Sequence, residues 1–444
     1  MTLLPDLVAI GLWLALVASL CVLVSIVVSW RLLWNVADPL LLVFVNVGLN
    51  VAIVVVLADA RQESAIAYVL AGFVAFLAGL HTFRSRRRAD EIAPALRAPG
   101  RGATLLLLGT AAALYLVYDA FIISQVGIGV FGSENPDIAK VTVTQGGYGV
   151  FRHLYVAANL FYLPLLVHSF VVYRRRSVLV FGALLFLIQN LVFNFSKAGF
   201  VFAIFDLGLL AQFYQNALGK RVLSLRLAGL VALVGLVPAL LVLGVVSALS
   251  GVSILQMVLT RLAATGSGTY MYFVLDGSAA FYHMELPARL VLFFDVLLSS
   301  LRLKPWAPLS FPGMVSTHLT GVELPGFGAN PYPFVAGHFL FGWGGVLYCF
   351  GVGALLSFAR TRRANLLVFY IMNQSVLVFV ADPGITQAYV IALLVIAPAV
   401  FLVNLVAWTQ RRRLLVPVRV AYARWVERRI HASITTREPR VTPP

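Results

Sequence analysis

Long apolar runs separated by short polar or basic stretches dominate the sequence. A helix needs roughly 20 mostly apolar residues to cross a bilayer. Eleven such runs lie at about 7–30, 39–58, 64–83, 103–126, 152–173, 178–195, 199–215, 224–248, 336–358, 365–381 and 386–408. The first run lacks the basic leader and small-residue cleavage site of a signal peptide, so we interpret it as a helix. The pattern predicts an all-α polytopic membrane protein with about 11–12 transmembrane helices.

Composition supports this class and excludes two others. The 444 residues are 61% hydrophobic and 11% charged, whereas a soluble domain is ~45–50% apolar and ~25% charged. A water-soluble globular enzyme and a disordered chain are therefore excluded. The two cysteines, Cys21 and Cys349, both lie in apolar runs, so we expect neither a disulfide framework nor a thiolate metal site.

The distribution of basic residues predicts the orientation of the helices, because Lys and Arg are retained in short cytoplasmic loops. Of the 33 basic residues, 25 follow odd-numbered runs or lie in the C-terminal tail. The other eight are Arg61, Lys140, Arg152, Lys197, Arg261, Arg289, Arg302 and Lys304. This asymmetry predicts an N-terminus outside the cytoplasm and a cytoplasmic C-terminus. It also explains the net charge of +16 without a nucleic-acid partner.

This orientation divides the chain into four segments. They are 1–248, with eight helices and a periplasmic loop at 127–151; 249–335, a large periplasmic loop; 336–408, the C-terminal helices; and 409–444, a basic amphipathic cytoplasmic tail. In the large loop, stretches at 252–264 and 286–303 are moderately apolar, and Asp295 interrupts the second. We expect helices there that lie along the membrane interface or dip partway into the membrane. The tail is typical of a helix on the anionic inner leaflet, with docking to a partner as the alternative.

Several motifs are missing from the sequence. It contains no P-loop, no GxGxxG after a strand, no HExxH, no paired CxxC and no DxD. We therefore do not expect a nucleotide-sugar enzyme with a metal held by adjacent aspartates. The predicted outer face is poor in carboxylates and rich in Arg, His and Tyr, which suits an anion such as a diphosphate. With a long outer loop and no cytoplasmic domain, any chemistry is expected at the outer face.

Two motifs place basic residues at the outer ends of predicted helices. NFSKAGF at 194–200 is a polar break between two runs, where Ser196, Lys197 and the next helix N-terminus can bind an anion. The alternative is a hairpin whose lysine extends to the interface. Arg152 and His153 begin the fifth run, where a position at headgroup level explains them as well as a site does. Two polar residues near the seventh run, to which we assign no role, are Asn194 and Asp206.

Two further motifs contain candidate catalytic residues. In LTRLAATGSGTYMY, Arg261 precedes a Gly/Ser break and two tyrosines, of which Tyr270 is the candidate, and Arg261 can bind either a lipid-linked diphosphate or a lipid headgroup. In NPYPFVAGHFLFGWGGVLY, His338 lies about one turn inside a predicted span. A histidine within a span usually faces a cavity or a partner, and it can accept a proton at neutral pH. The alternative is a packing histidine among glycines that ease helix contact.

These motifs and the hydropathy pattern resemble the bacterial oligosaccharide repeat-unit polymerases, the Wzy-type or O-antigen polymerase class. The resemblance rests on NFSKAGF at a helix turn-around, on Arg261 before GSGTYMY, and on GANPYPFVAGHFLFGWGG leading into a span. It covers about 45 residues directly, and the hydropathy pattern extends it over the whole chain. The eleven predicted spans differ from the twelve or more usual in that family.

The resemblance implies a GT-C-like glycosyltransferase in the bacterial inner membrane, acting on undecaprenyl-diphosphate-linked oligosaccharides at the periplasmic face. Arg261 and Lys197 would bind the diphosphate, and His338, or a carboxylate such as Glu323, would act as the base. Further substrate-binding candidates are Ser196, Arg152, Arg289, Arg302 and Tyr270. No cofactor is implied. The expected partners are membrane lipids, a chain-length regulator and a flippase.

Other functions remain open on the sequence. An O-antigen ligase would use the same donor with a lipid A-core acceptor, and another GT-C-like transferase would share the plan. A lipid-linked oligosaccharide flippase or other secondary transporter belongs to a different class. Transporters commonly contain internal repeats, and no convincing repeat is found here.

Overall fold

The computed structural model is helical and contains no strand in the part of the chain that it describes. The described residues are 11–35, 37–83, 101–126, 149–189, 197–218, 265–305, 311–321, 330, 332–361 and 365–394, with scattered residues at 237–256. All of these residues belong to one compact unit, 1–397. Predictions for the C-terminal tail and for the loop at 127–148 fall outside the described residues.

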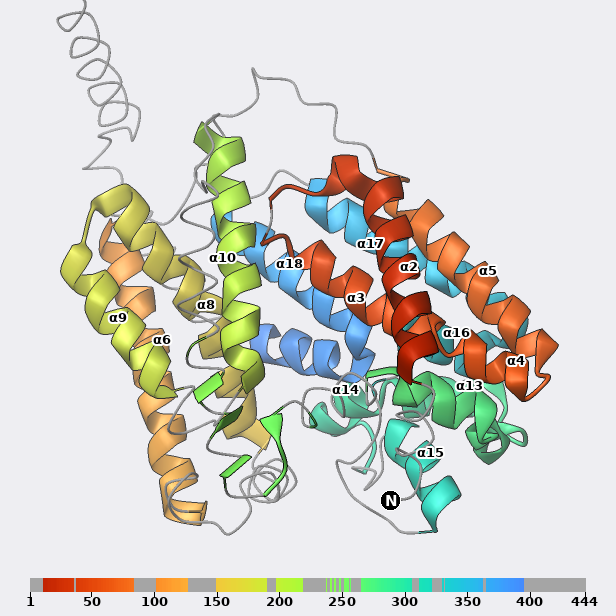
Figure 1. Cartoon of the computed structure of the whole chain (residues 1–444). Helices are drawn as coiled ribbons and strands as arrows, with labels where there is room; N and C mark the ends of the chain where they lie inside the picture. The colour runs from red at the N-terminus through yellow and green to blue at the C-terminus, as the bar shows by residue number, and fades with distance from the viewer. Residues whose placement is uncertain are drawn as a thin grey trace, which may run out of the picture. The chain divides into compact units, whose positions relative to one another are not determined.

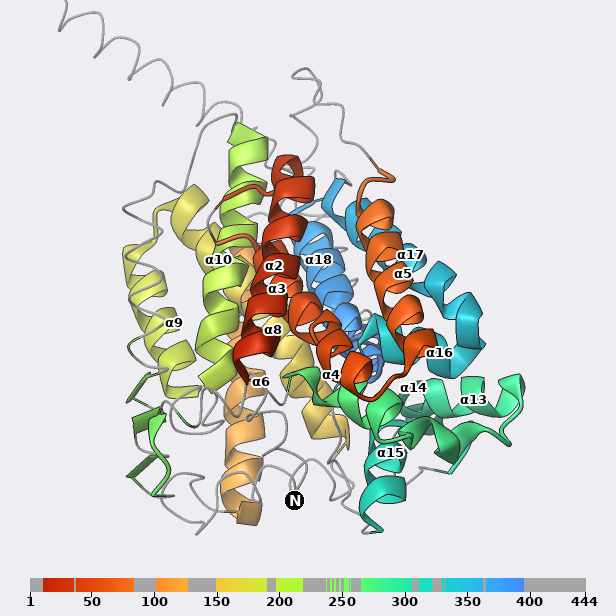
Figure 2. The same cartoon turned by 45° about the vertical axis from the view of Figure 1, so that its right-hand side comes forward.

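The N-terminal helices pack with α17, a helix from the C-terminal part of the chain. They are α2 (Gly11–Ser29), η1 (Trp30–Leu32), α3 (Pro39–Val51), α4 (Val54–Asp59), α5 (Glu63–Leu80) and α17 (Gly345–Thr361). Figures 1 and 2 show α5 and α17 side by side. Glycines allow this approach, because Gly79 of α5 lies against the carbonyl of Phe350, and Gly353 of α17 lies against the carbonyl of Phe76. Small residues at a helix interface let two backbones come close in a membrane.

A second set of helices packs together around α8 and α18. It comprises α6 (Arg101–Val126), α8 (Gly149–Tyr173), α9 (Arg176–Ile188), α10 (Lys197–Leu218), α18 (Leu366–Ala381) and the helix Pro383–Leu394. α6 packs along α8, and α18 contacts α8, α10, α3 and α17 (Figure 1). The side chain of Asn365 starts α18 by accepting a hydrogen bond from the backbone N–H of Val368 at 2.9 Å. α18 therefore connects the two sets of helices.

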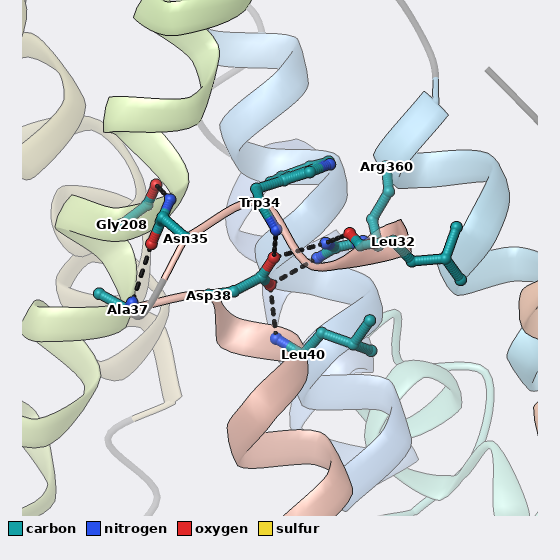
Figure 3. Close-up of polar contacts among 8 residues, drawn as sticks. All are labelled: Leu32, Trp34, Asn35, Ala37, Asp38, Leu40, Gly208 and Arg360. Atoms are coloured by element: carbon teal, nitrogen blue, oxygen red, sulfur yellow. Dashed lines mark hydrogen bonds and ion pairs between the residues drawn. The ribbon is translucent and has the colours of Figure 1, made fainter. Parts of the chain in front are cut away.

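A buried ion pair joins the α2–α3 connection to the end of α17 (Figure 3). Nη1 and Nη2 of Arg360 donate to the two carboxylate oxygens of Asp38 at 2.9 and 2.8 Å. Nη2 also donates to the carbonyl of Leu32, and the guanidinium lies 3.8 Å from the ring centre of Trp34. Asp38 also accepts from the backbone N–H of Leu40, which caps α3. The pair joins the segment after α2 to the end of α17. The distribution of basic residues predicts both on the cytoplasmic side of the membrane.

Short helices occupy the segment predicted as a large external loop. They are η5 (Tyr270–Val274), η6 (Gly277–Phe281), α13 (Leu286–Phe293), α14 (Asp295–Ser300) and α15 (Phe311–Thr320). The predicted apolar stretch at 286–303 contains two short helices, since α13 ends at Phe293 and α14 begins at Asp295. Asp295 forms an ion pair with Lys304 at 2.5 Å. The position of these short helices relative to a membrane interface stays a prediction.

Six described segments are long and apolar enough to cross a membrane. They are Trp13–Leu32, Pro39–Asp59, Glu63–Leu80, Arg101–Phe121, His153–Tyr173 and Pro333–Thr361, and shorter apolar helices lie at Arg176–Ile188, Leu366–Ala381 and Pro383–Leu394. The protein is thus an all-α membrane protein. The number of 11–12 helices stays a prediction, because the run at 224–248 falls largely outside the described residues.

One expected helix differs from its prediction. The run at 336–358 forms no continuous helix, because α16 (Pro333–Phe341) ends at Gly342 and a turn, η7 (Gly342–Gly344), precedes α17. Gly342 has φ of 56°, a left-handed conformation that glycine adopts without steric cost. Hydropathy does not detect this break, since the glycines and Trp343 keep the run apolar.

Candidate functional site

His338 lies in the short helix α16, beside the break that separates α16 from α17. Pro333 at the start of α16 favours helix initiation there. Gly337 of α16 and Gly345 of α17 approach each other through their backbones, so α16 packs against the first turn of α17. Of the glycines in this motif, Gly337 and Gly345 make this helix contact, whereas Gly342 has no atom near the position of an added Cβ. The histidine is held at a corner between two helices.

Aromatic side chains surround the His338 imidazole. The ring centre of Tyr68 lies 4.9 Å away, that of Phe273 5.1 Å and that of Tyr272 5.6 Å, all in edge-to-face geometry. The Tyr68 hydroxyl donates to the carbonyl of Phe334 at 3.0 Å, which anchors α5 to the start of α16. His338 is only half-buried among these rings. Three separate segments, α5, η5 and α16, thus meet around the imidazole.

A hydrogen bond between Tyr272 and His338 determines what the imidazole can do. The Tyr272 hydroxyl lies 3.2 Å from Nδ1. If this hydroxyl accepts from Nδ1–H, Nε2 has a lone pair and can accept a proton; if it donates to Nδ1, Nε2 carries the hydrogen. Within the described residues, Nε2 has no hydrogen-bond partner.

Tyr272 belongs to η5, a π-helical turn of a kind that is frequent at functional sites. Burial raises the pKa of Tyr272 above its ordinary value, and the nearby positive charge of Arg289 opposes that shift. The phenol therefore stays protonated at neutral pH. It can orient the imidazole as donor or acceptor without carrying charge.

Arg289, in α13, lies near this pair, but its guanidinium is bound to the backbone. Nε donates to the carbonyl of Met284 at 2.9 Å, Nη1 to that of Phe339 at 3.0 Å and Nη2 to that of Phe281 at 3.1 Å. These three bonds tie α13 and η6 to α16, the helix of His338. The role that the geometry supports for Arg289 is to position these elements and to supply positive charge near the imidazole.

The structure places the other predicted site residues as follows. Tyr270 is buried in η5, and Arg302 is exposed just after α14. Arg152 and Lys197 belong to the first turns of α8 and α10. Outside the described residues lie Ser196, Arg261 and Glu323. Of the predicted residues, His338 and Arg289 are brought close together, and the others stay separate candidates.

Two residues of this site were not among the predicted ones. Tyr272 follows Tyr270 by two residues in the TYMY sequence, and in a helical turn residues two apart face different directions. The orientation of η5 therefore determines which of the two tyrosines reaches His338, and the sequence does not show that orientation. Tyr68 lies within the apolar run of α5, where no local pattern distinguishes it from a packing residue.

Comparison with known proteins identifies no relative. No protein-family model matches the chain, no curated protein matches it, and no solved structure matches it.

Proposed function

We propose that the protein is a membrane-embedded glycosyltransferase that polymerises undecaprenyl-diphosphate-linked oligosaccharide repeat units, without metal or nucleotide, at the periplasmic face of a bacterial inner membrane. The observation that carries this proposal is the half-buried His338, which is hydrogen-bonded to Tyr272 at a broken helix. The short helices η5, η6 and α13 lie beside it, in the segment that the basic residues assign to the outer face. The sequence resemblance supplies the substrate class.

The proposed reaction needs one base and one anion-binding group. The terminal hydroxyl of a new lipid-linked repeat attacks the anomeric carbon of the growing chain. The new C–O bond forms as the bond from that carbon to undecaprenyl diphosphate breaks. The hydroxyl proton passes to Nε2 of His338, and the departing diphosphate retains the bonding electrons. Arg261 and Lys197 would stabilise the diphosphate charge.

In this scheme Tyr272 is a positioning residue. Its hydroxyl accepts from Nδ1–H, which leaves the Nε2 lone pair free for the proton of the acceptor.

Surface polysaccharide and lipid-linked intermediates from a strain lacking the gene test the proposal directly. A single-repeat product in place of the polymer ladder is expected, since export and attachment would still work. Polymer that accumulates on undecaprenyl diphosphate would instead identify a ligase. Loss of all exported repeats would identify a transporter. An unchanged glycan pattern would overturn the family assignment.

Complementation of that strain with variants tests the residues. His338→Ala is expected to lower polymer formation by about 100-fold or more, because general-base catalysis contributes roughly 10²–10⁴. Tyr272→Phe is expected to lower it less. His318→Ala, which changes an exposed histidine of α15, is the matched control and should restore the full ladder. Immunoblots of the membrane fraction would separate loss of activity from loss of protein. Full activity of a His338→Ala, Arg261→Ala double variant would rule out the scheme.

A further inference from the structure

A second polar cluster lies among α6, α8, α10 and α18, apart from the elements that hold His338. Asp206 of α10 accepts a hydrogen bond from the hydroxyl of Tyr370 at 3.0 Å, and its other oxygen accepts from the side-chain amide of Gln374. Both donors belong to α18. The carboxyl group of Asp206 thus faces another helix and not the open surface.

Asp119 of α6 is the second carboxyl group of this cluster. It is only 3% exposed, and neither of its oxygens has a hydrogen-bond partner in the described chain. The neighbouring polar group is the amide of Gln189, which is equally buried and makes no hydrogen bond of normal geometry with described residues. A buried carboxylate without such bonds is costly, whereas a protonated carboxyl group is much less so.

Tyrosines lie near both carboxyl groups. Tyr115 lies one helical turn before Asp119, and its hydroxyl donates to Oδ1 of Asn159 on α8 at 2.5 Å. Tyr115 lies near both Asp119 and Asp206. The other titratable groups that face the two carboxyl groups from the packed helices are Tyr155, Tyr370 and Tyr389.

No basic side chain neutralises this cluster within the described residues. The ion pairs found there are Lys304–Asp295 and Arg360–Asp38. The described residues also contain no group of three His, Cys, Asp or Glu side chains that could hold a metal ion. Ionisable side chains in membrane helices that lack an ionic partner commonly mark proton-transfer sites.

We propose that Asp119 and Asp206 form an intramembrane proton-binding site, with Tyr115 one turn from Asp119 and Tyr370 bonded to Asp206, in which the neutral acid forms are present in the folded protein. Proton binding and release there would change the charge between α6, α10 and α18. This proposal is independent of the glycosyltransferase assignment, since it rests on different residues and on different helices.

A hydrophobic carbodiimide tests it, because this reagent adds to protonated carboxyl groups within the apolar part of a membrane protein. The full chain, purified in its membrane-mimetic detergent, would be treated with dicyclohexylcarbodiimide between pH 6 and pH 9, and the adducts mapped by mass spectrometry. We expect adducts at Asp119 and Asp206, with labelling that falls about tenfold for each pH unit above the titration midpoint. Asp38, equally buried but paired with Arg360, is the internal control and should stay unlabelled.

Asp119→Asn and Asp206→Asn variants complete the experiment. Each should lose the adduct at its own position and keep the other, with an unchanged elution volume in size-exclusion chromatography. Absence of both adducts at pH 6 in the unsubstituted protein would overturn the proposal. Labelling that sodium ions abolish at constant pH would also overturn it, and would assign the site to Na⁺. Neither outcome affects the glycan assay, so the two proposals fail separately.

Discussion

The guanidinium of Arg289 holds neighbouring elements together through hydrogen bonds to the backbone. Its nitrogen atoms donate to the carbonyls of Met284, Phe339 and Phe281, which belong to or border three different elements. A planar group with donors in a fixed fork can meet three such acceptors, whereas an ammonium group cannot reproduce that geometry. The positive charge near His338 is therefore tied to the packing of α13 and η6 on α16.

Arg289→Lys is accordingly expected to destabilise the protein by about 2 kcal/mol, because hydrogen bonds from a charged donor are lost at buried carbonyls. The thermal unfolding temperature of the purified variant in detergent measures this. Arg302→Lys is the matched control, since Arg302 is exposed, and it should leave that temperature unchanged. Equal effects of the two substitutions would contradict the positioning role of Arg289.

At the scale of elements, the close packing of α5 on α17 depends on a few glycines. Gly353 is buried against the backbone of Phe76, whereas Gly351 of the same helix has no atom near the position of an added Cβ. A side chain larger than hydrogen at Gly353 would force the helices apart. The same separation would move α16, because α16 packs against the first turn of α17.

Gly353→Val should therefore cost about 1–3 kcal/mol or more through overpacking. Gly351→Val, a matched substitution on the open face, should cost little. Both variants are compared by heating membranes and measuring the fraction of protein that stays soluble in detergent. If the two variants unfold at the same temperature, the glycine contact does not determine the packing of α5 and α17.

The ion pair of Asp38 with Arg360 acts at the scale of the whole molecule, because its partners are separated by 322 residues. Asp38→Asn would leave a buried, unpaired guanidinium, for which the expected cost is about 3–5 kcal/mol. The double variant Asp38→Asn, Arg360→Met removes that charge and should recover much of the loss. Unfolding temperatures of the two variants test this. A double variant no more stable than the single one would show that unpaired charge is not the cause.

The orientation of the helices is a further prediction at this scale. In a background with Cys21 and Cys349 replaced by serine, Ser64→Cys at the start of α5 should react with a membrane-impermeant maleimide in intact spheroplasts. Ser177→Cys at the start of α9 should react only after the membrane is permeabilised, because it follows the cluster Arg174–Arg176. Both serines are exposed near helix ends, so they form a matched pair. The reverse pattern would invert the predicted topology.

The sequence alone predicts the class of the protein and the positions of most described helices along the chain. Apolar runs are local, and a run of about 20 such residues has few alternatives to a helix in lipid. In the apolar stretch at 286–303, where helices were expected, the structure contains α13 and α14. The break at Gly342 escaped the prediction, because a left-handed glycine turn leaves the hydropathy of the run unchanged.

Which polar residues contact one another depends on how the helices pack, and the sequence does not predict it. Tyr272 and His338 are separated by 66 residues, and Tyr68 reaches α16 across 266 residues to bond Phe334. Asp206 had no assigned role until α18 brought Tyr370 and Gln374 to its carboxyl group. Such contacts depend on the rotation of each helix about its axis and on its neighbours. Apolar helices with little amphipathic contrast do not encode that rotation in their hydropathy, so packing between helices determines it.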